Sequence, residues 1–143
     1  MITVRLLGPN DAAVLDQVAP GVFDHPTDPR WTAEFFADPR HHLAVALDGT
    51  TVVGMASAVH YVHPDKAPAL WVNEVGVAPA YQRRGLGTQL LRAIVERGRT
   101  LGCTEAWLGT ETSNEAARAL YNHAGWREEA EPFVTYTIEI ERK

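Results

Sequence analysis

Residues 74–88 read Glu-Val-Gly-Val-Ala-Pro-Ala-Tyr-Gln-Arg-Arg-Gly-Leu-Gly-Thr, and this stretch decides the fold. The apolar run over residues 70–77 predicts a strand, and Ala78-Pro79 predicts the turn that ends it. A basic loop with two glycines follows and leads directly into a helical pattern. Unpaired backbone amides and the positive end of the helix dipole meet at such a start. The stretch therefore predicts an anion-binding site.

The composition indicates one ordinary globular domain that spans residues 1–143. Apolar residues make up 45% of the chain and charged residues 22%, and the length suits a single core. The net charge of −5 argues against nucleic acid as a partner, because phosphate binding favours a basic surface. The lone Cys103 excludes an internal disulfide and fits a reducing cytoplasm. Without a signal pattern or a membrane-length apolar run, we expect a cytoplasmic protein with no membrane partner.

Hydrophobic periodicity predicts an α/β fold with a mixed, mostly antiparallel sheet and helices on both faces. The expected strands cover residues 3–7, 43–47, 51–61, 69–77, 105–110, 126–128 and 133–141. The expected helices cover residues 11–19, 33–37 and 85–101, and a last helix follows a capping box over residues 112–115. Short turns between the second, third and fourth strands imply an antiparallel meander. The strand–helix–strand order over residues 69–110 implies a parallel crossover.

Two of these strands carry more specific predictions. Gly54, inside a long strand, indicates a bulge or the close approach of another part of the chain. The last strand alternates along its length, and we expect Ile138 and Ile140 to point into the core. Its outer edge could pair with a second copy, which allows a homodimer.

The glycine-bearing loop does not fit the common phosphate motifs. A P-loop needs Lys-Ser or Lys-Thr after its last glycine, and the dinucleotide fingerprint needs a third glycine where Leu90 stands. Gly85 and Gly87 have no side chain to keep a ligand from the backbone. An ordinary helix start with a solvated basic pair, Arg83 and Arg84, explains the loop equally well on this evidence.

A second motif favours a ligand-binding loop over an ordinary helix start. Gln82, Gly85 and Gly87 after an apolar strand, with Asn114, Ala117, Tyr121, Gly125 and Trp126 later in the chain, resemble the GCN5-related N-acetyltransferases, or GNAT family. The resemblance covers nearly the whole chain. It implies a single GNAT domain whose two central strands splay apart, with acetyl-CoA as co-substrate and a primary amine as acceptor.

The resemblance also assigns residues that hold acetyl-CoA. The loop amides would bind the pyrophosphate, the β-strand backbone would pair with the pantetheine arm, and Asn114 would contact that arm or brace the slot. The amide of Val75 would donate to the thioester oxygen as it becomes an oxyanion. The expected cofactor residues are Val75, Gly76, Val77, Gln82, Arg83, Arg84, Gly85, Leu86, Gly87, Thr88, Asn114, Ala117 and Tyr121.

Two side chains are the candidates for proton transfer. Most of an aliphatic amine is protonated at pH 7, so a base must accept a proton before attack on the thioester. Glu74 is a carboxylate in an otherwise apolar strand, and we expect burial there to suit it to this role, directly or through water. Tyr121 would donate a proton to the departing CoA thiolate. Attack is direct because no nucleophile is apparent, and the six histidines show no metal spacing, so we expect no metal.

The acceptor is the least determined part of the prediction. Residues 119–129 and 22–24 are similar to aminoglycoside N-acetyltransferases that modify the three-position amine, although Glu74 stands where that group has aspartate. Several acidic side chains on the expected acceptor side would suit a polycation, although solvated surface charge explains them equally: Asp24, Asp28, Glu111, Glu128, Glu129 and Glu131. A small cationic amine such as an aminoglycoside is favoured. A protein or peptide amine, or a non-catalytic acyl-CoA sensor, is the alternative.

Overall fold

The computed structural model describes residues 1–141, so the last two residues of the expected domain lie outside it. In chain order its elements are β1 (Ile2–Leu6), η1 (Ala12–Asp16, a 3₁₀ turn), α1 (Pro29–Ala37), β2 (His41–Asp48), β3 (Thr51–Tyr61), β4 (Ala69–Val77), η2 (Pro79–Tyr81, a 3₁₀ turn), α2 (Leu86–Thr100), β5 (Ala106–Trp107) and α3 (Glu115–His123). The five strands lie side by side in sequence order, and only the β4–β5 pair is parallel. The mixed, mostly antiparallel α/β sheet is confirmed.

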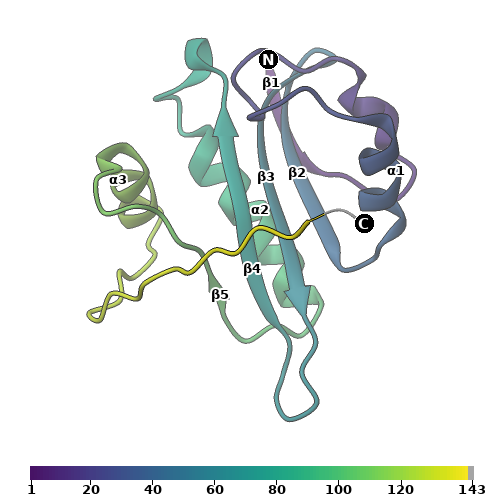
Figure 1. Cartoon of the computed structure of the whole chain (residues 1–143). Helices are drawn as coiled ribbons and strands as arrows, with labels where there is room; N and C mark the ends of the chain where they lie inside the picture. The colour runs from purple at the N-terminus through teal and green to yellow at the C-terminus, as the bar shows by residue number, and fades with distance from the viewer. Residues whose placement is uncertain (142–143) are drawn as a thin grey trace.

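Two apolar clusters cover the two faces of the sheet. On one face, α2 buries Leu86, Leu90 and Ile94 against β2, β3 and β4. On the other face, η1 and the segment after it pack on β2 and β3, with the two phenylalanines of α1 at the margin. Figure 1 shows α2 crossing behind the sheet. At about 1.5–3 kcal/mol for each fully buried large aliphatic side chain, the α2 cluster is a major part of the stability.

Two bulges interrupt the alternation of the long strands. Ala46 pairs with Gly54 and Leu47 with Val52, so the β3 residue between them is extra. A Cβ on Gly54 would lie 3.2 Å from Leu90 Cδ1, so α2 also approaches the backbone closely here. The bulge and the close approach predicted at Gly54 are both confirmed. The second bulge is in β4, where Ser57 pairs with Glu74 and Ala58 with Val72, which leaves Asn73 without a partner.

The end of the chain differs from the prediction. The strand expected over residues 105–110 is two residues long, and residues 126–141 contain no strand. Ile138 and Ile140, expected inside, are 85% and 89% exposed. Figure 1 shows this segment as an irregular yellow trace. An alternating pattern describes the two faces of a strand, but a strand also needs a neighbouring edge, and β5 ends too soon to offer a long one.

Two helix starts also differ from the prediction. The first expected helix is only the short η1 turn, after which Val18 forms an isolated bridge with Val52 instead of continuing helically. The last helix begins at Glu115, and its cap is Asn114 rather than the first residue of the expected capping box. The Asn114 side chain accepts a hydrogen bond from the Ala117 amide at 3.0 Å, which satisfies one of the unpaired donors at the helix start.

Candidate active site

The loop before α2 has the backbone shape of an anion nest. Arg83 has φ 63° and Gly85 has φ 77°, so two residues of the loop adopt the left-handed conformation. Such a conformation is uncommon for arginine and marks a site where the surrounding structure imposes it. The amide of Gln89 donates to the Gly85 carbonyl at 3.2 Å, so the helical bonds begin there and the amides before it have no helical acceptor. These donors fit a diphosphate.

Side chains hold this loop against the sheet. Gln82 Nε2 donates to the Val77 carbonyl at 3.1 Å, which ties the loop to the end of β4. The Tyr81 hydroxyl donates to Asp48, and the Arg84 guanidinium lies 5.1 Å from the centre of the Tyr81 ring. Arg84 therefore stacks on the loop. Arg83 is exposed at its tip.

The three glycines of this region have different roles. A Cβ on Gly85 would meet nothing within 4 Å, so this glycine leaves the loop open and permits its left-handed backbone. A Cβ on Gly87 would lie 3.0 Å from Leu120, so Gly87 lets α2 and α3 pack closely and is not open to a ligand. A Cβ on Gly76 would lie 2.1 Å from the Val22 carbonyl oxygen. The side-chain positions of Gly76 and Gly87 thus face protein, which differs from the expectation for Gly87.

The parallel strands β4 and β5 separate after a short contact. They pair only through Leu70 with Ala106 and Trp71 with Trp107, whereas β4 continues to Val77. The remaining edge of β4 therefore has no β5 partner, and the expected splay is confirmed. The antiparallel β3 lies along the other edge of β4.

The backbone of β4 presents hydrogen-bonding groups to that open edge. The Ala78 amide donates across to the Val53 carbonyl at 2.8 Å, on the β3 side. Because backbone groups alternate between the two edges of an antiparallel strand, those of Val77 and Val75 point to the opposite, open edge. Gln82 uses the Val77 carbonyl. The amides of Val75 and Val77 suit an extended ligand that adds to the sheet like a strand.

Tyr121 lies on the α2 side of this opening. Its ring is half-buried and packs on the α2 cluster, and burial raises the pKa of its hydroxyl above the ordinary value. Among residues 1–141 every buried side-chain nitrogen or oxygen has a hydrogen-bond partner. The Tyr121 hydroxyl makes no such bond there, so water reaches it. It therefore stays protonated at neutral pH.

Glu74 lies on the opposite face. Leu70, Val72, Val75 and Val77 all pack toward α2, so the β4 bulge shifts the alternation by one residue between Val72 and Val75. Asn73 and Glu74 therefore both belong to the face away from α2. Strict alternation would place Asn73 and Glu74 on opposite faces of the sheet, and the bulge places them on the same one. The expectation that Glu74 is buried is wrong, because its side chain is exposed.

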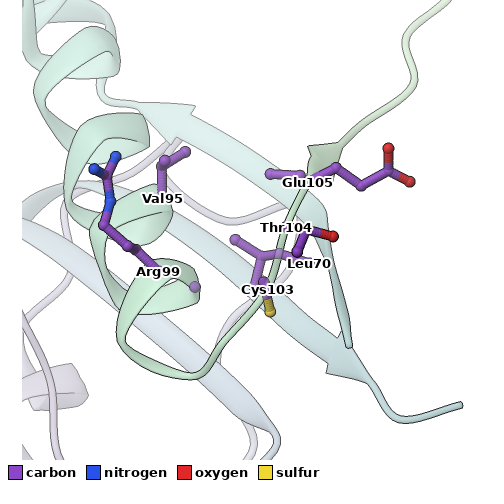
Figure 2. A pocket seen from close by; sticks show the side chains of 8 residues that line it. Leu70, Val95, Arg99, Cys103, Thr104 and Glu105 are labelled. Atoms are coloured by element: carbon purple, nitrogen blue, oxygen red, sulfur yellow. The ribbon is translucent and has the colours of Figure 1, made fainter. Parts of the chain in front are cut away.

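One pocket lies away from this opening. It has a volume of about 350 Å³ and is bounded by the C-terminal turn of α2 and the start of β5, next to Cys103. Figure 2 shows its charged side chains, Arg99 and Glu105, pointing away from each other. Burial raises the pKa of the Cys103 thiol, which makes it a poor nucleophile. The side chains that line this pocket do not form a cluster of reactive groups.

Some features of the site are absent from the sequence prediction. The Trp71–Trp107 contact and the Val22 approach to Gly76 bring together residues that are distant in the chain. Strict alternation of side chains along a strand does not predict these contacts. The two adjacent polar residues Asn73 and Glu74 in an otherwise apolar strand do indicate a bulge. In the part of the chain that the structure describes, no three His, Cys, Asp or Glu side chains are arranged to hold a metal ion, and no helix is long and apolar enough to cross a membrane.

Comparison with known proteins agrees with this geometry. A sequence model described as the acetyltransferase (GNAT) family matches residues 12–126. The N-alpha-acetyltransferase RimI of Mycobacterium tuberculosis is 32% identical over 130 residues, which cover 88% of this chain and 78% of that protein. The ribosomal protein bS18 alanine N-acetyltransferase of Salmonella typhimurium is 30% identical over 129 residues, covering 90% and 82%.

Solved structures share the fold. The aminoglycoside N-acetyltransferase AAC(6')-Iy in complex with CoA superposes with a TM-score of 0.76 over 98% of this chain and 96% of that one. Its sequence is 22% identical, so the likeness is one of fold.

Proposed function

Because this chain belongs to the acetyltransferase (GNAT) family, which uses acetyl-CoA as co-substrate, we propose that it acetylates the terminal α-amine of a peptide or protein. The observation that carries the proposal is the placement of Glu74 and Tyr121 on opposite faces of the sheet beside the open edge of β4. An acceptor amine can reach Glu74 from one face while the leaving thiolate lies toward Tyr121 on the other. This separation supports the role of base for Glu74 and of acid for Tyr121.

The loop and the open edge fit acetyl-CoA. The amides of residues 84–88 and the Arg83 guanidinium suit the pyrophosphate, because they combine unpaired donors with positive charge. The outward amides of Val75 and Val77 suit the amide groups of the pantetheine arm. Asn114 supports the site indirectly, because its Oδ1 caps α3 and so fixes the helix that carries Tyr121.

The chemistry follows from these positions. Acetyl-CoA supplies the acetyl group as an activated thioester. Glu74, directly or through a water molecule, accepts the proton of the ammonium group, and the neutral amine forms the new C–N bond at the carbonyl carbon. The Val75 amide donates a hydrogen bond to the oxygen as its negative charge develops. The C–S bond then breaks, and Tyr121 supplies the proton of the CoA thiol. The attacking nitrogen gives up its excess proton, which restores the Tyr121 hydroxyl through solvent, and the neutral amide product leaves.

Two observations favour an α-amine over a polycationic antibiotic. The two relatives that match 88% and 90% of this chain are named as an N-alpha-acetyltransferase and as a ribosomal protein bS18 alanine N-acetyltransferase, whereas relatives named as L-2,4-diaminobutyric acid acetyltransferases match 62–71% of it. Half of the six carboxylates that would suit a polycation already pair with an arginine: Asp28 with Arg30, Glu128 with Arg118, and Glu129 with Arg127. Such exposed pairs add little stability, but they reduce the negative charge available to a polycation. An aminoglycoside remains the second candidate, on the sequence similarity in residues 119–129.

A panel of amines tests the proposal. Purified protein is mixed with acetyl-CoA and, separately, an alanine-initiated peptide, an aminoglycoside, a polyamine and a lysine-containing peptide with a blocked N-terminus, and release of the CoA thiol is followed. We expect the alanine-initiated peptide to give the highest kcat/KM. Faster turnover of the aminoglycoside or of the blocked lysine peptide would contradict the proposal.

A homodimer stays a prediction. Apolar side chains are 70–92% exposed along the C-terminal segment, at Phe133, Val134, Tyr136, Ile138 and Ile140. Sedimentation of the protein across a concentration series tests the prediction, because burial of this segment against a second copy would make the measured mass rise with concentration.

A further inference from the structure

Two tryptophans form a surface on the Glu74 face of the sheet. Trp71 of β4 and Trp107 of β5 are register partners, and their rings meet edge to face with centroids 4.3 Å apart and an interplanar angle of 62°. Trp107 is 46% exposed. Exposure of so large an apolar ring on a small protein is a common mark of a binding surface.

The face of this pair follows from the packing of its neighbours. Leu70 and Val72 belong to the α2 cluster, so Trp71 between them belongs to the other face. The bulge puts Glu74 on that same face. Trp71 precedes Glu74 by three residues, which at about 3.3 Å per residue is a separation of at most about 10 Å along the strand.

A pocket adjoins the tryptophans at the far end of β4. Its volume is about 260 Å³, and it is lined by His63, Lys66, Ala67, Ala69, Thr104, Glu105 and Trp107. Ala69 begins β4 and lies five residues before Glu74, so the pocket is about 16 Å from the candidate base along the strand. Glu74, the tryptophans and the pocket thus follow one another along one face of the sheet.

We propose that the Trp71–Trp107 pair and the adjoining pocket form the subsite for the acceptor peptide downstream of its reacting amine. The proposal rests on the proposed function, since it assumes an α-amine at Glu74. An extended peptide advances about 3.3–3.6 Å per residue, so its fourth residue lies over the tryptophans and its fifth or sixth reaches the pocket. A large apolar side chain at position four packs on the exposed Trp107 ring. A small amine ends before this surface and gains nothing from it.

The spacing makes the proposal testable with peptide length. Alanine-initiated peptides of two to seven residues, with leucine at position four where the length allows it, are compared by kcat/KM. We expect a rise of about tenfold between three and six residues, carried mainly by KM, because the downstream contacts act on binding and not on the reacting atoms. In Trp107→Ala we expect the kcat/KM values for short and long peptides to become nearly equal.

Matched variants separate binding from folding. Trp31 of α1 is 65% exposed, and Trp31→Ala removes an equally large side chain elsewhere, so it keeps the length dependence. Trp107→Phe retains a ring and keeps most of the length dependence, which covers the case in which Trp107→Ala does not fold. The thermal shift with acetyl-CoA confirms that each variant still binds the co-substrate.

The outcomes distinguish this inference from the proposed function. If no alanine-initiated peptide is acetylated while another amine of the panel is, the proposed function fails and this inference fails with it. If peptides are acetylated without a gain on lengthening, or if the gain survives in Trp107→Ala, only the subsite is overturned. A gain that Trp107→Ala removes and Trp31→Ala keeps supports it.

Discussion

The side-chain position of Gly76 faces the backbone of Val22 so closely that a Cβ there would lie 2.1 Å from the Val22 carbonyl oxygen. The contact fixes the segment after η1 against β4, two residues beyond Glu74. Gly76→Ala should therefore lower the free energy of unfolding by about 1–3 kcal/mol, because the added methyl has to displace backbone atoms. Urea unfolding measures the change.

Gly8→Ala is the matched control for that variant. A Cβ on Gly8 would have Asp11 Oδ2 as its nearest neighbour, at an ordinary contact distance of 3.6 Å. Its effect should stay within about 1 kcal/mol. Equal stability of Gly76→Ala and the wild type would show that the close approach of Val22 does not constrain the fold.

Replacement of Glu74 tests the proposed base. Glu74→Gln keeps the size of the side chain and removes its ability to accept the proton, so kcat/KM for the acceptor should fall by about 10²–10⁴. The KM for acetyl-CoA should not change, since Glu74 lies on the acceptor face. Glu96→Gln, at an exposed side chain of α2, is the control. A Glu74→Gln rate within a few-fold of the wild type would remove Glu74 from the chemistry.

Replacement of Tyr121 tests the proposed acid. Burial raises the pKa of Tyr121, so the hydroxyl carries its proton throughout the neutral range. Tyr121→Phe should lower kcat by about 10²-fold or more, because the thiolate then leaves without a proton donor. The melting temperature should change little, since the lost hydroxyl makes no bond within residues 1–141. An unchanged kcat, measured by thiol release at saturating substrates, would contradict the assignment.

Two substitutions of Arg83 distinguish the effect of its charge from the strain of its left-handed backbone. Arg83→Ala and Arg83→Gly both remove the guanidinium, and both should raise the KM for acetyl-CoA by about three- to tenfold, as loss of one exposed contact to a phosphate implies. Only the glycine variant relieves the φ of 63°, so it should be about 1 kcal/mol more stable than the alanine variant. If the two variants are equally stable, the loop is not strained at this position.

The buried His42, which contacts the half-buried His60, should make stability depend on pH. His42 Nε2 lies 2.8 Å from His60 Nδ1, and burial, with smaller contributions from His60 and Arg97, lowers the pKa of His42 from 6.5 to about 4. The unfolded chain therefore binds a proton that the folded chain excludes between these values. Stability is full above pH 6.5 and falls toward pH 4, by up to about 3 kcal/mol for this residue.

Urea unfolding at several pH values between 7 and 4.5 measures this loss. The stability of His42→Leu should fall less steeply over this pH range than that of the wild type, because the variant lacks the group that binds the proton on unfolding. Carboxylates that titrate in the same pH range are present in both proteins, so the comparison isolates His42. Parallel declines in the two proteins would mean that His42 is not the group responsible.

The parts of the fold that sequence predicts well are those governed by local chemistry. The loop at residues 82–88, the long helix after it and the Gly54 bulge all follow from glycines at positions where the backbone needs them. The open edge of β4 was expected only through the resemblance of two motifs that lie more than twenty residues apart in the chain.

The parts that sequence misses depend on pairing between distant segments. The Asn73 bulge reverses the alternation of β4, and it is this reversal that exposes Glu74 and places it on the Trp71 face. Gly87 looks like part of a ligand loop, but it is a contact between two helices. The alternation of residues 133–141 gives no information about whether a neighbouring edge exists for that segment.

Competition between acceptors tests the central claim most directly. One reaction contains acetyl-CoA, an alanine-initiated hexapeptide and an aminoglycoside at equal concentration, and mass spectrometry identifies which amine gains the acetyl group, for the wild type and for Glu74→Gln. The account predicts acetylation at the peptide α-amine by the wild type and its near absence in Glu74→Gln. Acetylation of the aminoglycoside in preference to the peptide, or equal peptide acetylation by both proteins, would contradict it.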